Sequence, residues 1–161
     1  MFLQNKIENL YKSFPLKKGT KEVLKGLSFQ ADPGEVFCLL GSNGSGKTTL
    51  LRVLAGLSQQ YSGTVHWCGK DIRQSRSSLA EDTLYIGHLA GVKALLSPLE
   101  NLSWWVSLHI SSGDAVSKAK LLAALSQVGL ERFANTPCHQ LSAGQQRRIA
   151  LARLYLSEHR L

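Results

Sequence analysis

The sequence predicts an α/β fold with a helical subdomain inserted after its core. The apolar run 36–40 leads through a glycine-rich loop into a segment of helical spacing, which makes a strand, a loop and a helix in succession. Beyond Gly91 the chain continues as helices without alternating strands. We therefore expect all 161 residues to form a single domain, with a core over about 1–90, a helical subdomain over about 91–140 and a further helix over 142–157.

Apolar patterning and turn residues define the expected elements of the core. Asp32, Pro33 and Gly34 form a turn before the run 36–40, which is apolar throughout and therefore predicts a strand buried on both faces. The expected core elements are strands at 7–14, 23–30, 36–40, 63–68 and 83–87, a helix from Thr48 to about Gly56, and a loop at 73–78.

The helical subdomain is predicted from its capping and breaking residues. Ser97 and Pro98 begin a helix that runs to Leu108 and contains Trp104 and Trp105. An aromatic pair of this kind either packs in the core or faces a partner protein. A break follows at 111–114, and a second helix is expected over 115–128.

The composition is that of one globular domain. Hydrophobic residues make up 43% and charged residues 19%, with a mean hydropathy of -0.07, which excludes a disordered tail. A length of 161 residues excludes a multi-domain enzyme. No stretch approaches the roughly 18 apolar residues of a membrane span, and the polar segment 1–11 does not match a signal peptide. We therefore expect the protein in the cytosol.

The net charge of +8 favours anionic partners such as nucleotides, nucleic acid or an anionic membrane surface. The basic residues are scattered and aromatic residues make up only 7%, so we expect no nucleic-acid partner. Cys38, Cys68 and Cys138 are too far apart to predict a zinc site or a disulfide, and we expect buried or inert thiols.

The strongest chemical signal is a phosphate-binding loop. Its residues match G-x-x-x-x-G-K-[ST] at every fixed position and are Gly41, Ser42, Asn43, Gly44, Ser45, Gly46, Lys47 and Thr48. The glycines let the backbone wrap round phosphate oxygens, and the following helix N-terminus attracts a polyanion. Lys47 adds a charge at the β- and γ-phosphates, and the Thr48 hydroxyl ligates Mg²⁺. Thr49 completes the predicted nucleotide site.

A second motif precedes the helix at 142–157 and consists of Leu141, Ser142, Ala143, Gly144 and Gln145. Ser142 is suited to cap that helix, and by itself the segment is an N-capped basic helix. Together with the phosphate loop it resembles the LSGGQ signature of the ATP-binding-cassette (ABC) transporter ATPases, with Ala143 in place of the first glycine.

This resemblance implies a P-loop NTPase core of the ABC ATPase type that binds ATP and Mg²⁺. In that family the signature helix faces the γ-phosphate of ATP on a second ATPase subunit, so two subunits form a head-to-tail dimer. The resemblance also implies an aromatic residue that stacks on adenine, which we assign to Phe14. A strand-core role for Phe14, or stacking by Tyr11 instead, are the alternatives.

Within the family, the chain is most similar to the ATP-binding subunits of haem exporters in cytochrome c maturation. The segments that carry this likeness are 41–52, 85–88, 91–93, 99–102 and 141–148. The resemblance implies an ATP-binding and ATP-hydrolysing subunit that is cytoplasmic and peripheral on the cytoplasmic face of the inner membrane. It also implies integral membrane transporter subunits as partners and haem or a maturation intermediate as cargo.

Two departures from the family pattern limit what carries over. His88 stands where most members have a glutamine that ligates Mg²⁺, so it either positions water, contacts the membrane partner or is simply solvated. The family also continues with a strand ending in Asp-Glu and a switch histidine, whereas this sequence has no Asp after Asp114. We therefore expect the C-terminal part of the ATPase to be missing.

Without those carboxylates no catalytic residue is assigned with certainty, and hydrolysis by the chain alone should be feeble. Two alternative functions remain open. The first is an ABC ATPase that serves another substrate. The second is a truncated nucleotide-binding module that does not hydrolyse ATP.

Overall fold

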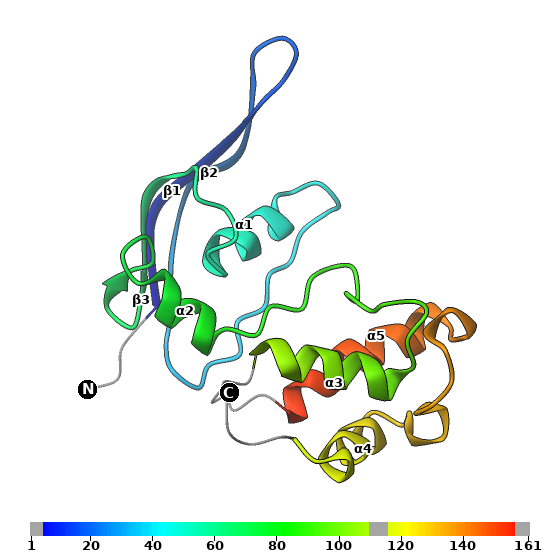
Figure 1. Ribbon diagram of the computed structural model, residues 1–161. Coiled ribbons are helices and arrows are strands. Elements are labelled where there is room, and N and C mark those ends of the chain that lie inside the picture. Colours follow the sequence, from blue (N-terminus) through cyan, green and yellow to red (C-terminus); the bar gives the residue numbers. More distant parts are fainter. Residues whose placement is uncertain (1–4, 110–115, 157–161) are drawn as a thin grey trace. The chain divides into compact units, whose positions relative to one another are not determined.

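The computed structural model describes residues 5–109 and 116–156, and Figure 1 shows the order of its elements. The chain divides into two compact units between Thr83 and Leu84. The first unit holds all the strands and two helices, and the second is helical. The expected break at 111–114 lies outside the described residues.

The first unit contains a four-stranded antiparallel sheet in the order β2-β1-β3-β4. Its strands are β1 (Asn5–Pro15), β2 (Thr20–Ala31), β3 (Ser62–Trp67) and β4 (Lys70–Asp71). One core cluster joins the sheet to helices α1 (Lys47–Leu54) and α2 (Arg76–Asp82). Its buried members are Ile7, Leu10, Leu24, Leu50, Val53, Val65, Ile72 and Leu79. The predicted strands at 7–14, 23–30 and 63–68 are thus confirmed, as is the helix from Thr48.

The predicted strand at 36–40 is wrong, because the segment is irregular and pairs with no strand among the described residues. Val36 and Leu40 are 95% and 89% exposed, although burial on both faces was expected. Phe37 stacks on Phe29 of β2 with ring centroids 4.8 Å apart. A strand of a parallel sheet becomes regular only when neighbouring strands accept its hydrogen bonds and cover both faces.

The predicted strand at 83–87 is also wrong, because these residues are irregular as well.

Apolar side chains of the segment 36–40 line two hollows of the first unit, of about 300 and 370 Å³. Phe37 and Leu39 line both of them. The apolar runs were therefore identified correctly, but apolarity without a pairing partner does not produce a strand.

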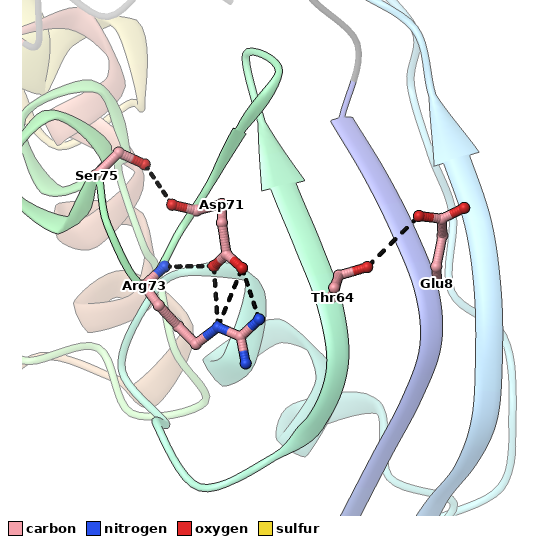
Figure 2. Close-up of polar contacts among 5 residues, drawn as sticks. All are labelled: Glu8, Thr64, Asp71, Arg73 and Ser75. Carbon is pink, nitrogen blue, oxygen red and sulfur yellow. Dashed lines mark hydrogen bonds and ion pairs between the residues drawn. The ribbon is translucent and has the colours of Figure 1, made fainter.

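The predicted loop at 73–78 is wrong in its second half, where α2 begins. Figure 2 shows the turn that leads into this helix. The carboxylate of Asp71 accepts from the Arg73 amide at 2.8 Å and pairs with the Arg73 guanidinium at 2.6 Å. Arg73 thereby lowers the pKa of Asp71. Ser75 donates to the Asp71 carbonyl at 3.0 Å, and Leu79 is buried against the sheet cluster. Side-chain contacts across the turn thus start a helix that apolar spacing does not reveal.

The second unit packs three helices round one core. They are α3 (Pro98–His109), α4 (Lys118–Gln127) and α5 (Ala143–Ala152), followed by a 3₁₀ turn at Arg153–Tyr155. The predicted helices are confirmed, although the one expected over 142–157 has its α-helical part only over α5. Trp105 is buried in this core, which is one of the two expected roles. Trp104 is 41% exposed with the Lys93 amine 4.2 Å from the centre of its ring, and a contact with a partner protein stays a prediction. No helix of the described residues is long and apolar enough to cross a membrane.

Asn101 of α3 organises the irregular segment 84–97 that precedes this helix. Its side chain is 1% exposed. The Oδ1 atom accepts from the Lys93 amide at 2.8 Å, and Nδ2 donates to the carbonyls of Lys93 and Ser97, each at 3.0 Å. The same Nδ2 lies 3.3 Å from the Cys138 sulfur. One amide side chain therefore gives the Lys93 amide its acceptor and adds a second donor to the carbonyls of Lys93 and Ser97, which also accept from backbone amides.

Replacing Asn101 by alanine leaves the Lys93 amide without its acceptor and removes one donor from each of two carbonyls. We expect Asn101→Ala to lower the free energy of unfolding by about 2 kcal/mol, since an orphaned donor costs on the order of 1–3 kcal/mol. Urea denaturation measures the change. Asn135→Ala, at an exposed position, is the matched control. Equal stability of the two variants would contradict this role.

Candidate functional site

The glycine-rich loop 41–46 is closed round the amine of Lys47. Its Nζ atom donates to the carbonyls of Gly41 at 2.7 Å and of Ser42 at 2.8 Å. The Ser45 hydroxyl is 3.5 Å away, and the Ser45 amide donates to the Ser42 carbonyl at 3.2 Å. The loop therefore encloses a cation, as binding of a polyphosphate requires.

Two glycines of the loop have no room for a side chain. A Cβ at Gly41 would lie 2.6 Å from the Ser45 hydroxyl oxygen. Gly46 has φ +97°, and its Cβ would lie 3.0 Å from Val23 of β2. Gly44 also has a left-handed φ of +82°, but faces open space. The backbone thus curls tightly at its two ends and leaves its apex accessible to a ligand.

Helix α1 begins directly behind this loop. Its first hydrogen bond runs from Leu50 to the Gly46 carbonyl at 2.9 Å, so the amides of Lys47, Thr48 and Thr49 have no acceptor within the helix. The first turn holds no acidic residue. The Thr48 side chain is exposed. Free amides, an uncompensated helix dipole and an exposed hydroxyl fit a phosphate group with its magnesium ion.

Phe14 lies near the tip of the β1–β2 hairpin and is 41% exposed, so it is not a residue of the strand core. The Lys12 amine lies 5.1 Å from the centre of its ring. Tyr11 is 43% exposed, and its hydroxyl lies beside Gly26, where an added Cβ would be 2.7 Å away. Both aromatic residues offer an accessible ring face, and the choice between them remains a prediction.

In the second unit, the signature segment starts helix α5. Ser142 is the N-cap, as predicted, and forms a capping box with Gln145. The Ser142 hydroxyl accepts from the Gln145 amide at 3.2 Å, and the Gln145 side chain accepts from the Ser142 amide at 2.8 Å. Leu141 is buried, whereas Ala143 and Gly144 are exposed at the helix N-terminus. The helix thus presents small residues and backbone amides to solvent.

Two arginines of the same helical region hold the segment 84–97. Arg147 donates to the carbonyls of Gly87 and His88, the latter at 3.3 Å. Arg153 donates to the Gly91 carbonyl at 2.9 Å and lies over Trp105 at 5.9 Å. The His88 residue itself is exposed. The arginines therefore connect the signature helix to the backbone that carries His88.

Arg153 is 9% exposed, and burial lowers the pKa of its guanidinium. None of the ion pairs in the described part of the chain involves it. We predicted no role for Arg147, Arg153 or Asn101 from the sequence. Arg153 was detectable in principle, because it stands four residues after Ile149, in the register of the buried face of α5.

Metal and thiol chemistry find little support among the described residues. They contain no group of three His, Cys, Asp or Glu side chains that could hold a metal. The expectation of buried thiols is right for Cys138, whose pKa is raised by burial. Cys38 is not buried, because the segment 36–40 is not a buried strand, and an inert thiol there stays a prediction. Thr48 remains the predicted magnesium ligand.

The family profile described as ABC transporter matches residues 24–161. The chain belongs to this family. It is 50% identical over 130 residues to the cytochrome c biogenesis ATP-binding export protein CcmA of Pseudomonas fluorescens (strain Pf0-1), covering 81% of this chain and 60% of that protein. The CcmA protein of Yersinia pestis bv. Antiqua (strain Nepal516) is 48% identical over 131 residues, covering 81% and 58%. This ABC transporter chain thus spans less than two thirds of the length of these relatives.

Solved structures confirm the predicted ABC ATPase fold. The ABC transporter chain superimposes on the ATP-binding cassette MJ0796, described as dimeric and bound to ADP and Pi, with a TM-score of 0.83 and 26% identity. That match covers 95% of this chain and 69% of MJ0796. CbiO1 from Clostridium perfringens gives a TM-score of 0.74 at 26% identity, covering 98% and 62%. The predicted likeness to the ATPases of cytochrome c maturation is confirmed by the CcmA relatives.

Removing Arg147 should release the backbone at His88. We expect Arg147→Ala to accelerate limited proteolysis within 87–91 on the order of tenfold, because hydrogen bonds to a charged group contribute about 1.5–3 kcal/mol. Cleavage sites and rates measured by mass spectrometry test this. Arg148→Ala is the matched control, since Arg148 donates instead to the Val128 carbonyl at 2.9 Å. Faster cleavage within 87–91 in both variants, or in neither, would refute the connection.

Proposed function

We propose that this chain is the nucleotide-binding part of an ABC ATPase that drives export during cytochrome c maturation. The observation that carries the proposal is the loop 41–46, closed round Lys47 at the N-terminus of α1. The proposed process, cytochrome c maturation, is taken from the relatives named cytochrome c biogenesis ATP-binding export protein CcmA. Haem or a maturation intermediate is the proposed cargo. The likeness to CbiO1, part of the ABC transporter complex cbiONQ, makes an ATPase for another substrate the second candidate.

ATP is held by the residues of the phosphate loop. Lys47 moves its hydrogen bonds from loop carbonyls to the β- and γ-phosphates, and the amides at the start of α1 donate to the same oxygens. Thr48 ligates Mg²⁺, which when bound neutralises developing charge on the phosphates. Phe14 stacks on the adenine.

The signature helix acts on the ATP of a second ATPase subunit in a head-to-tail dimer. The exposed small residues Ala143 and Gly144 allow close approach of a phosphate, and the capping box fixes the helix start at which it docks. Integral membrane subunits are the further partners, with the ATPase peripheral on the cytoplasmic face of the inner membrane. Arg147 couples the signature helix to His88, which faces one of these partners or the attacking water.

Hydrolysis needs carboxylates, and the phosphate loop 41–48 contains none. A carboxylate that anchors Mg²⁺ and one that polarises water are standard parts of such sites, yet residues 115–161 contain no Asp. Residues 1–161 are proposed to bind ATP through the phosphate loop. Turnover requires those carboxylates and the membrane partners.

Removing the loop cation should abolish phosphate recognition. We expect Lys47→Ala to raise the Kd for both ATP and inorganic tripolyphosphate on the order of 100-fold, because charge-assisted hydrogen bonds to two phosphates are lost. Isothermal titration calorimetry measures both ligands. Lys70→Ala removes the same charge at an exposed position and is the control. Unchanged affinity in Lys47→Ala would refute the phosphate-loop assignment.

The aromatic residue that stacks on adenine can be separated from phosphate binding. We expect Phe14→Ala to weaken ATP binding about fivefold while tripolyphosphate binding stays unchanged, since stacking contributes on the order of 1 kcal/mol. The same titrations test this. A selective loss of ATP affinity in Tyr11→Ala, but not in Phe14→Ala, would move the adenine site to Tyr11.

A further inference from the structure

The β1–β2 hairpin extends beyond the rest of the sheet. Pairing of β1 with β3 ends where Tyr11 meets Ser62, whereas pairing with β2 continues to Pro15 and Thr20. Figure 1 shows this part as a two-stranded projection that closes in a loop. In the turn, the Leu16 amide donates to the Gly19 carbonyl at 3.0 Å, and Gly19 has φ +84°. The tip, defined as residues 15–21, is therefore an ordered and accessible element of the first unit.

The tip and the strand that follows it are strongly basic. Lys17, Lys18, Lys21 and Lys25 are all exposed, and Glu22 is the one carboxylate between positions 12 and 25. In the ranges 5–109 and 116–156, the ion pairs are Lys6–Glu8 and Asp71–Arg73, which lie elsewhere. Lys17, Lys18, Lys21 and Lys25 thus form no ion pair with a described carboxylate and repel one another, which favours an anionic partner.

An apolar side chain lies beside these lysines. Leu16, directly before Lys17, is 55% exposed. Exposing an apolar leucine side chain to water costs free energy, and moving that side chain into an apolar medium recovers this cost. Flexible lysines next to an accessible apolar residue form the combination that suits the boundary between lipid headgroups and acyl chains.

We propose that the hairpin tip binds the anionic surface of a membrane. Lys17 and Lys18 contact lipid phosphates, and Leu16 enters the headgroup boundary. The contact is weak and electrostatic, so it orients a subunit that integral membrane partners retain. This inference goes beyond the proposed function. One step, the choice of a membrane over nucleic acid as the anionic partner, rests in part on the proposed function.

Nucleic acid is disfavoured by the residues of the hairpin themselves. Proteins that bind single strands combine a basic groove with several aromatic rings on which bases stack. Phe14 is the only aromatic residue between Lys12 and Lys25. Leu16 has no role on a phosphate backbone, whereas a lipid interface accommodates it.

Vesicle binding of the full 161-residue chain tests the proposal. We expect binding to vesicles of phosphatidylglycerol mixed with phosphatidylcholine, no binding to pure phosphatidylcholine, and loss of binding at high salt. Lys17→Ala combined with Lys18→Ala should weaken the binding roughly 25-fold, or about fivefold per lysine. Leu16→Ser should weaken it further. Sedimentation with vesicles measures all variants.

The control removes two closely spaced lysines, Lys118 and Lys120, from another surface. Lys118→Ala with Lys120→Ala changes the net charge equally on exposed positions of α4, and should leave vesicle binding unchanged. Equal loss in both double variants would show an effect of overall charge and overturn the proposal. Binding of a labelled RNA oligonucleotide through Lys17 and Lys18, without vesicle binding, would overturn it as well. Lys17 and Lys18 are not among the residues assigned to the nucleotide site, so ATP titration of the same variants reports the proposed function separately.

Discussion

Carbonyl groups of irregular backbone need hydrogen-bond donors, and both motifs of this chain depend on how that need is met. In the first unit, Lys47 supplies the donor for Gly41 and Ser42. In the second, Asn101 and Arg147 serve the segment that precedes α3. Each of these side chains is rooted in a regular helix. The helices therefore position loops that have no secondary structure of their own.

This arrangement has a consequence for ligand binding. A lysine that already donates to two carbonyls is held inside its loop, so little side-chain entropy remains to be lost when phosphate oxygens replace those carbonyls. The glycines at positions 41 and 46 bring the loop backbone close enough to enclose the amine. Binding energy is then available for the phosphates and their metal ion instead of for ordering the loop.

Arg147 and Arg153 bind backbone carbonyls and form no ion pair within the described residues, so they fix the position of the neighbouring backbone. Arg153 is buried without a carboxylate among the described residues, and its contacts are a carbonyl and the face of Trp105. Such an arginine stabilises one arrangement of the backbone, because any other leaves a buried cation without acceptors. Together with the hydrogen bonds of Arg147 to Gly87 and His88, this contact connects the segment that carries His88 to the signature helix.

Local signals accounted for the features that the sequence predicted well. The phosphate loop, the Ser142 cap and the helix that starts at Pro98 each depend on residues within a few positions of one another. The hairpin strands were found because their apolar and turn residues alternate over a short range. The helix at Arg76 was missed, since the contacts of Asp71 with Arg73 that precede it are visible only in three dimensions.

The amino-acid sequence by itself determined where the glycines, the capping residues and the loop lysine stand, and hence the family and the nucleotide site it implies. Tertiary structure decided which apolar runs became strands. The run 36–40 and the segment 83–87 stayed irregular because strand formation needs a partner from elsewhere in the chain. It also decided the burial of Asn101 and Arg153, since a polar side chain enters a core only where distant backbone groups accept its hydrogen bonds.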